Sequence, residues 1–201
     1  HYSLLPKYRG ASPIQSALLN DEKVTGISVM KMTDGLDEGP VYFFHKQKIL
    51  HKDNRNTLEE KLTSLAIKNI DKDLSDIYFD NLVPIKQGSK NISYCKKIDK
   101  LSGKITLDQE ESDSVFRKYK AYYDWPGLYF EFKNLKIKIH GIDLKVKKNT
   151  NFMKNKFYFH DNLLHAKTID GSIVITYLQF PGKRIISSND AANSYADFFI
   201  D

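Results

Sequence analysis

The chain has 201 residues, 41% of them hydrophobic, which is enough to bury the core of one large domain or of two small ones. Its apolar runs are short, so the sequence predicts no membrane span, and the single cysteine, Cys95, excludes an internal disulfide and a multi-cysteine zinc site. The net charge of +6 is uneven, because residues 1–95 hold 13 basic and 12 acidic side chains, whereas residues 96–201 hold 18 and 13. This basic surplus favours a polyanionic partner, although a generally lysine-rich surface explains it equally well.

Helical and strand patterns alternate along the first eighty residues. The predicted elements are a helix over residues 12–20, strands over residues 24–32 and 41–50, and a long amphipathic helix over residues 57–77. Ser12 has the residue type of a helix N-cap and precedes Pro13, which suits the first helical position. Thr57 and Glu60 have the spacing of a capping box. The glycine-rich segment between the strands is a tight loop of the kind that commonly displays functional side chains.

Residues 81–95 show no periodicity and contain a proline and a glycine, so they are predicted to link two domains. A helix over residues 112–123 follows, then five or six short strands up to residue 180, and a closing helix in SNDAANSYADFFI. One helix followed by short strands and small turns favours a small β-barrel such as an OB-fold. Trp125 could stack on a base, but because it stands before a proline and among aromatic residues, it is more often a core residue, and we predict a core position.

Two segments of the first domain concentrate residue types that are suited to chemistry. The first is HYSLLPKYRG at residues 1–10, and the second is GLDEG at residues 35–39. Considered separately, a lone histidine is usually structural, and an aspartate in a glycine loop usually caps its own turn. Neither residue alone therefore indicates a site, and the weight lies on the order and spacing of the two segments.

The segments HYSLLPKYRGASPIQSALL and TGISVMKMTDGLDEGP stand in the order and at the spacing seen in the formyltetrahydrofolate-dependent formyltransferases, and the chain resembles that family over its whole length. The resemblance implies a catalytic trio: an asparagine, a histidine two residues later, and an aspartate in an LDxG loop. The histidine is His1 and the aspartate is Asp37, whereas the asparagine would precede His1 and is not in this chain. The resemblance also implies a folate-binding wall, which equally suits a rigid strand-to-helix connection, at Ser3, Leu4, Leu5 and Pro6.

The implied reaction explains these residue types. An amine attacks the formyl carbon of 10-formyltetrahydrofolate, and a negative charge develops on the formyl oxygen. The asparagine amide and His1 are suited to donate hydrogen bonds to that oxygen. Asp37 is suited to orient His1 and to relay protons between the attacking amine and the folate nitrogen. This chemistry requires no metal and no nucleotide cofactor, and the five other histidines show no metal-ligand spacing.

The second domain resembles the carboxy-terminal barrel of methionyl-tRNA formyltransferases. The resemblance lies in the segments YCKKIDKLSGKITL, WPGLYFEF and LQFPGKRIISSNDAANSY, and it implies that the domain binds tRNA. Basic side chains that contact phosphates would position an RNA without reading its sequence. The candidates for these contacts are Lys96, Lys97, Lys183 and Arg184. For any single one of them, a solvated basic surface is an equally good interpretation.

We therefore expect an incomplete Rossmann-like α/β formyltransferase domain over residues 1–80, a linker over residues 81–95, and an OB-like β-barrel domain that binds tRNA over residues 96–201. The expected function is transfer of a formyl group from 10-formyltetrahydrofolate to methionyl initiator tRNA in translation initiation, which releases tetrahydrofolate. We expect the intact protein to be a cytoplasmic monomer without a membrane association. The 201 residues alone are expected to have little or no activity.

Two alternatives stay open at this point. The first is a transferase that formylates an amino sugar bound to a nucleotide, since such enzymes share the SLLP and LDxG segments, and it would require a pocket for a nucleoside diphosphate. The second is a nucleic-acid-binding module without activity, in which the first domain serves only as a scaffold.

Overall fold

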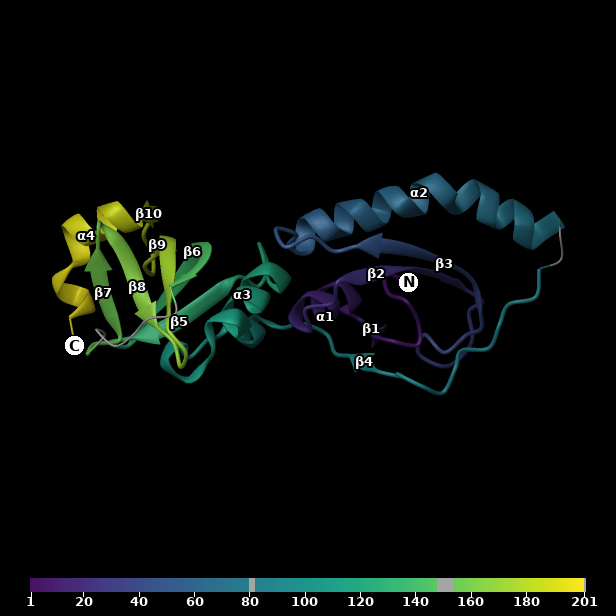
Figure 1. Cartoon of the computed structure of the whole chain (residues 1–201), viewed down its shortest axis with the longest axis horizontal. Coiled ribbons are helices and arrows are strands. Elements are labelled where there is room, and N and C mark those ends of the chain that lie inside the picture. Colours follow the sequence, from purple (N-terminus) through teal and green to yellow (C-terminus); the bar gives the residue numbers. More distant parts are fainter. Residues whose placement is uncertain (80–81, 148–153, 201) are drawn as a thin grey trace. The chain divides into compact units, whose positions relative to one another are not determined.

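The computed structural model describes residues 1–79, 82–147 and 154–200, and the chain divides into two compact units, His1–Ile98 and Asp99–Asp201 (Figure 1). The predicted boundary between residues 80 and 81 falls outside the described residues. The described part of the predicted linker does not stand apart from the first unit. Ile85 forms an antiparallel bridge with Val41, and residues 94–95 pair with residues 9–10, so this segment belongs to the first unit.

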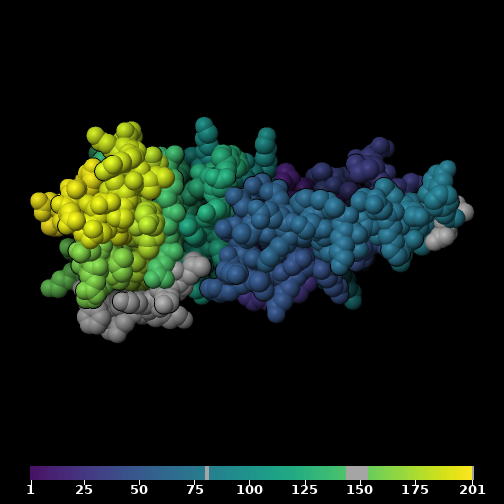
Figure 2. Space-filling model, turned by 90° about the horizontal axis from the view of Figure 1, so that it is seen from above, coloured from purple at the N-terminus to yellow at the C-terminus, as the bar shows by residue number. Residues whose placement is uncertain are grey.

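The first unit contains two helices and two small sheets. Its elements are β1 (Arg9–Gly10), α1 (Pro13–Leu19), β2 (Val24–Met30), β3 (Val41–Lys48), α2 (Arg55–Phe79) and β4 (Tyr94–Cys95). Strands β2 and β3 form an antiparallel pair, and β1 pairs with β4 in parallel. Helix α2 lies along the β2–β3 pair (Figure 1), and the view from above shows its outer surface (Figure 2).

Helix α1 forms where the sequence predicts it and begins at Pro13. Its buried residues are Ile14, Ala17 and Leu18. Ser12 occupies the N-cap position but does not cap the helix with its side chain. Its hydroxyl donates instead to the carbonyl oxygen of Lys96, at 2.6 Å. The hydroxyl therefore fastens the start of the helix to the chain that leads out of β4.

Helix α2 begins at Arg55, earlier than the predicted capping box of Thr57 and Glu60 would place it. Asn54 forms the box with Thr57: its side-chain oxygen accepts from the Thr57 amide, and the Thr57 hydroxyl accepts from the Asn54 amide, both at 3.0 Å. The residue spacing is that of a capping box shifted by three positions. The helix then buries Leu58 and Leu62.

Buried carboxylates strengthen the contact between α2 and its surroundings. Asp53 is almost fully buried and accepts from the Lys61 ammonium at 2.7 Å. Asp73, which is also buried, lies 2.7 Å from Nε2 of His45 on β3. Each buried charge has a partner, as a low-dielectric environment requires.

The second unit is built around one sheet. Its elements are η1 (Lys100–Gly103), η2 (Leu107–Gln109), α3 (Ser112–Ala121), β5 (Leu128–Phe132), β6 (Leu135–Lys147), β7 (Phe157–His160), β8 (Leu163–Lys167), β9 (Ser172–Gln179), β10 (Ile185–Ser187), α4 (Ser188–Tyr195) and η3 (Asp197–Phe199). The strands pair in the antiparallel order β5-β6-β9-β8-β7, with β10 beside β9. The closing helix α4 forms within the predicted segment SNDAANSYADFFI, but its cap is Ser187, the residue before that segment.

The sheet of the second unit is not a closed barrel in its hydrogen bonding. Within the described residues, no pairing joins the edge strands β5 and β7. Their side chains nevertheless meet, because the rings of Phe130 and Phe132 on β5 lie 5.1 and 4.9 Å, centroid to centroid, from that of Phe157 on β7. Phe199 packs against the same group and is 1% exposed. An aromatic core thus spans the gap between the two edges.

Candidate active site

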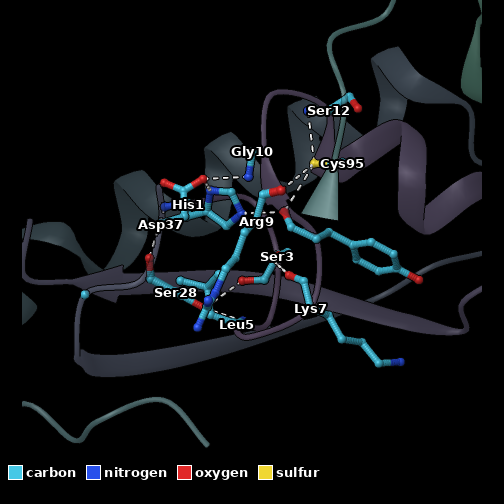
Figure 3. Close-up of polar contacts among 12 residues, drawn as sticks. His1, Ser3, Leu5, Lys7, Arg9, Gly10, Ser12, Ser28, Asp37 and Cys95 are labelled. Atoms are coloured by element: carbon cyan, nitrogen blue, oxygen red, sulfur yellow. Dashed lines mark hydrogen bonds and ion pairs between the residues drawn. The ribbon is translucent and has the colours of Figure 1, made fainter. Parts of the chain in front are cut away.

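The loop of residues 1–8 is fixed to β2 by Ser28. The Ser28 hydroxyl accepts from the Leu5 amide at 3.0 Å and donates to the Ser3 carbonyl at 2.6 Å (Figure 3). The Ser28 amide also donates to the His1 carbonyl at 2.9 Å. One buried serine therefore sets the path of this loop from its first residue to its fifth.

His1 and Asp37, 36 positions apart in the sequence, face one another in the structure (Figure 3). Nε2 of His1 lies 2.9 Å from the carbonyl oxygen of Tyr8. A carbonyl can only accept, so Nε2 carries a hydrogen and Nδ1 is the nitrogen that faces Asp37. The distance from Nδ1 to Oδ2 of Asp37 is 3.5 Å, and both side chains are largely buried. A basic ring nitrogen that faces a carboxylate in this way is suited to the exchange of one proton.

Asp37 is held in place by the backbone of β1. Its Oδ2 accepts from the Gly10 amide at 2.7 Å. Two glycines near this contact stand at close approaches of the backbone. A Cβ on Gly10, whose φ is +114°, would lie 2.3 Å from the Cys95 carbonyl oxygen, and one on Gly39 would lie 1.7 Å from that of Lys31. Gly39, the glycine of the LDxG loop, is therefore required by a close backbone contact.

The four predicted folate-wall residues divide into two kinds. Ser3 and Leu5 are buried and belong to the support of the loop. Leu4 and Pro6 line an open hollow of about 240 Å³. Its other lining residues are Lys7, Tyr8, Glu22, Val24, Thr25, Lys90 and Asn91. Of the four residues, Leu4 and Pro6 are thus the two that line this hollow.

Glu22 organises the polar side of this hollow. It accepts from the Lys7 ammonium and from the Tyr8 hydroxyl, each at 2.7 Å. Burial acts to raise the pKa of Glu22, but these hydrogen bonds and the charge of Lys7 outweigh it and hold the pKa below its ordinary value. Burial, followed by the bond to Glu22, raises the pKa of Tyr8, which stays a hydrogen-bond donor.

Two residues that sequence reasoning missed complete the site. Ser28 lies within an ordinary strand pattern, where no signal distinguishes it from a surface serine. Gln87 lies in the segment predicted to be a linker, yet its amide donates to the Asp37 and Gly39 carbonyls. Both act on backbone atoms of distant residues, so only the folded chain identifies them.

The four predicted tRNA-binding residues are exposed, and they belong to different units. Lys96 and Lys97 follow β4 at the end of the first unit. Lys183 and Arg184 lie in the turn between β9 and β10 of the second. The prediction that Trp125 is a core residue is wrong, because its side chain is 51% exposed. Its neighbours in the sequence line a hollow of about 180 Å³ with Tyr119, Tyr122, Tyr123, Lys138 and His140.

Over the described residues, no three His, Cys, Asp or Glu side chains gather in a way that could hold a metal ion. In the same part of the chain, no helix combines the length and apolar character needed to cross a membrane.

Comparison with known proteins connects this geometry to a family. The family described as formyl transferase matches residues 1–72, and the formyl transferase C-terminal domain matches residues 97–196. A methionyl-tRNA formyltransferase of Nitratiruptor sp. is 40% identical over 188 residues, which cover 94% of this chain and 60% of that protein. The chain thus spans about three fifths of the length of the curated relatives that it matches.

Solved structures share the fold at low sequence identity. HypX from Aquifex aeolicus, in complex with tetrahydrofolic acid, matches with a TM-score of 0.69 at 15% identity. The matched region covers 96% of this chain and 34% of the HypX chain. An N-formyltransferase from Helicobacter canadensis, solved with folinic acid and dTDP-3-aminofucose, matches with a TM-score of 0.66 at 20% identity. The matched region covers 86% of this chain and 63% of that enzyme's chain. The two domain matches, together with relatives such as the Nitratiruptor enzyme, show that the chain belongs to the formyl transferase family.

Proposed function

We propose that the whole protein that contains this chain transfers a formyl group from 10-formyltetrahydrofolate to the amino group of methionyl initiator tRNA. The observation that carries the proposal is the pair of His1 and Asp37, buried and facing one another in a chain whose curated relatives are methionyl-tRNA formyltransferases. The folate is the formyl donor, and it leaves as tetrahydrofolate.

The hollow beside the first loop suits part of a folate. Leu4 and Pro6 offer apolar contacts for a ring system, and Lys90 offers a positive charge for a carboxylate, whereas the charge of Lys7 is engaged by Glu22. Solved relatives of the same fold are named with tetrahydrofolic acid or folinic acid bound. We propose that the side chains of Leu4 and Pro6 contact the folate, while Ser3 and Leu5 contribute through the rigid backbone that they support.

In the proposed mechanism, Asp37 and His1 exchange one proton that comes from the attacking amine. Oδ2 of Asp37 accepts it, directly or through water, when the attacking amine loses it, and the folate nitrogen gains a proton as its bond to the formyl carbon breaks. His1 keeps a hydrogen on Nε2 for Tyr8, so its Nδ1 is the atom that exchanges a proton with Asp37. The burial of both groups strengthens their interaction with a charge that develops nearby.

We further propose that the first unit is part of a Rossmann-like domain and that the second is an OB-like, tRNA-binding domain. The aromatic contact between β5 and β7 supports a sheet curled toward a barrel. Lys183 and Arg184 are exposed on this unit and suited to phosphates, and Trp125 is exposed enough to stack on a base. Lys96 and Lys97 are exposed on the first unit and are likewise suited to phosphates. Monomeric state and cytoplasmic location stay predictions.

Replacing the carboxylate tests the proposed site. Asp37→Asn in the whole protein should lower kcat for formylation of charged initiator tRNA by about 10²–10⁴-fold, the usual contribution of a general acid or base. Binding of tRNA should be unchanged, because the lost interaction acts in the transition state. Asp34→Asn is the matched control, since Asp34 is an exposed carboxylate of the same loop. A D37N protein that retains full turnover would contradict the assignment.

The acceptor is tested in the same assay by offering charged initiator tRNA and an amino-sugar nucleotide together. Formylation of the tRNA supports the proposal, and formylation of the sugar alone would replace it with the sugar formyltransferase alternative. Transfer to neither acceptor, together with retained RNA binding, would favour a binding module. The 201-residue chain alone is expected to show little or no turnover under these conditions.

A further inference from the structure

We propose that Gln87 is a positioning residue for Asp37, because it holds the backbone of the loop that carries this carboxylate. Nε2 of Gln87 donates to the carbonyl oxygens of Asp37 and Gly39, both at 2.8 Å. Oε1 accepts from Nε of Arg9 at 3.1 Å and from Nη2 at 2.8 Å. The catalytic consequence rests on the proposed function, whereas the effect on the loop stands on the contacts alone.

The surroundings of Gln87 admit only one orientation of its amide. A guanidinium has donors and no acceptor, so it must face the oxygen, and two carbonyls have only acceptors, so they must face the nitrogen. All of the hydrogen-bonding capacity of the side chain is thereby used. Glutamate could keep the bonds to Arg9 but could not donate to the loop, and a shorter asparagine could not span the same gap. The site therefore selects glutamine by chemistry and by length.

The loop needs such an external support. Asp37 has a φ of +52°, in the left-handed region that is disfavoured for residues with a Cβ. Residues 33–36 are exposed, and Leu36 leaves 61% of its side chain in solvent, so apolar burial does little to hold this conformation. Polar contacts to Asp37 and its neighbours must supply the order that the loop lacks in itself.

Arg9 provides the anchor behind Gln87. Its side chain is 7% exposed, and its backbone is fixed because β1 pairs with β4. Nη1 of Arg9 donates to Oε1 of Glu38 and to the hydroxyl of Tyr94, each at 3.1 Å, and the Tyr94 hydroxyl donates to the same carboxylate at 2.7 Å. Two adjacent residues of β1 thus hold the loop, Arg9 through Gln87 and Glu38, and Gly10 through the Asp37 carboxylate.

Hydrogen exchange of the 201-residue chain tests the effect on the loop. In Gln87→Glu, the new carboxylate would face two carbonyls, so residues 33–39 and the Gly10 amide should exchange about tenfold faster, as expected for the loss of one or two hydrogen bonds. Gln87→Met removes the same donor without adding a charge and should act in the same direction, which guards against a variant that fails to fold. Gln47→Glu on β3 is the matched control and should leave both signals unchanged.

A double-mutant cycle in the whole protein tests the link to Asp37. Gln87→Glu alone should lower kcat by about 10²-fold, the scale of a displacement of a reacting group by an ångström, with KM for the tRNA unchanged. If Gln87 acts through Asp37, adding it to Asp37→Asn should cause little further loss, because the effects of residues that act as one unit do not multiply. A purely structural role would instead multiply the two losses.

The outcomes separate this inference from the proposed function. Unchanged exchange at Gly10 and residues 33–39 in both Gln87 variants would overturn the inference, whatever the enzyme does. Faster exchange combined with multiplying losses would overturn the link to Asp37. A whole protein that formylates neither acceptor would remove the proposed function, and the exchange result alone would then decide whether Gln87 orders the loop.

Discussion

In the second unit, the rings of Phe130, Phe132 and Phe157 meet around Phe199, and the sheet closes its gap with apolar side chains. In the first unit, loops beside two-stranded sheets are held by polar contacts between residues that are far apart in the sequence. Ser28 holds the first loop, and residues 85–95 hold β1 and the Asp37 loop. The aromatic core resists unfolding through the burial of apolar surface, a stabilisation that does not depend on the direction of individual contacts. The polar contacts fix atoms at set distances and angles, which is what a reacting group needs.

The difference has an energetic side. Loss of part of an aromatic core removes many weak contacts at once and leaves a cavity. Loss of one hydrogen-bond partner leaves a buried polar group unsatisfied, and its cost falls on the neighbouring atoms. We therefore expect substitutions in the second unit to act mainly on stability, and those in the first to act on geometry as well.

The largest stability effect should follow from Phe199→Ala. Removal of a buried phenylalanine costs about 3–5 kcal/mol, and in this case the whole loss should fall on the second unit. Urea unfolding followed by tryptophan fluorescence measures it directly, because Trp125, the single tryptophan, lies in that unit. Hydrogen exchange of α1 and β2 should stay unchanged.

Phe198 offers the matched control, since it is adjacent but only partly buried. Phe198→Ala should shift the fluorescence midpoint less than Phe199→Ala does. Equal shifts would mean that burial of Phe199 contributes no more than that of Phe198. Faster exchange in the first unit would mean that the two units do not unfold independently.

The sequence predicted most helices and strands of both units, because regular elements follow from local periodicity. Some of its predictions differ from the structure. Ser12 has the right type for a cap, but its hydroxyl bonds to Lys96. The N-cap of α2 lies three residues before the predicted Thr57, because Asn54 takes this position and Thr57 is its partner in the capping box. Trp125 was predicted to be core, although its side chain stands half in solvent.

The candidate site was predicted in part. His1 and Asp37 came from the resemblance to a family, and the structure brings them within 3.5 Å of one another, while their catalytic role stays a proposal. Ser28 and Gln87 could not be predicted, because each acts on backbone carbonyls or amides of residues at least 23 positions away. Such contacts leave no pattern in the sequence, since almost any residue can supply the backbone partner.

Ser28→Ala should have a smaller effect than Phe199→Ala. It leaves the buried Leu5 amide and the Ser3 carbonyl without their partner, which costs about 1–3 kcal/mol. The loss should appear in the first unit, as faster hydrogen exchange of residues 3–8, and not in the fluorescence of Trp125. Ser64→Ala, at an exposed position on α2, is the control and should change neither.

The smallest expected effect is the pH dependence of stability, which can be compared for one carboxylate in each unit. In the first unit, the pKa of Glu22 is lowered, because its bonds to Lys7 and Tyr8 outweigh the effect of burial. In the second, burial acts to raise the pKa of Asp170, but hydrogen bonds that include the Ser112 amide, at 2.8 Å, hold it below the ordinary value. A lowered pKa in the folded state means that the unfolded chain binds the proton more readily.

Each carboxylate therefore stabilises its unit fully above its ordinary pKa, 4.5 for Glu22 and 3.8 for Asp170, and loses this contribution as pH falls through the lowered value. Glu22→Gln should destabilise the first unit at neutral pH, and the difference should shrink toward zero in acid. Asp170→Asn should do the same for the second unit. Urea midpoints over a pH series, from hydrogen exchange for the first unit and Trp125 fluorescence for the second, measure both. Because each variant is the control for the other, a difference that persists in acid, or that appears in the wrong unit, would show that the carboxylate's charge is not what holds these contacts.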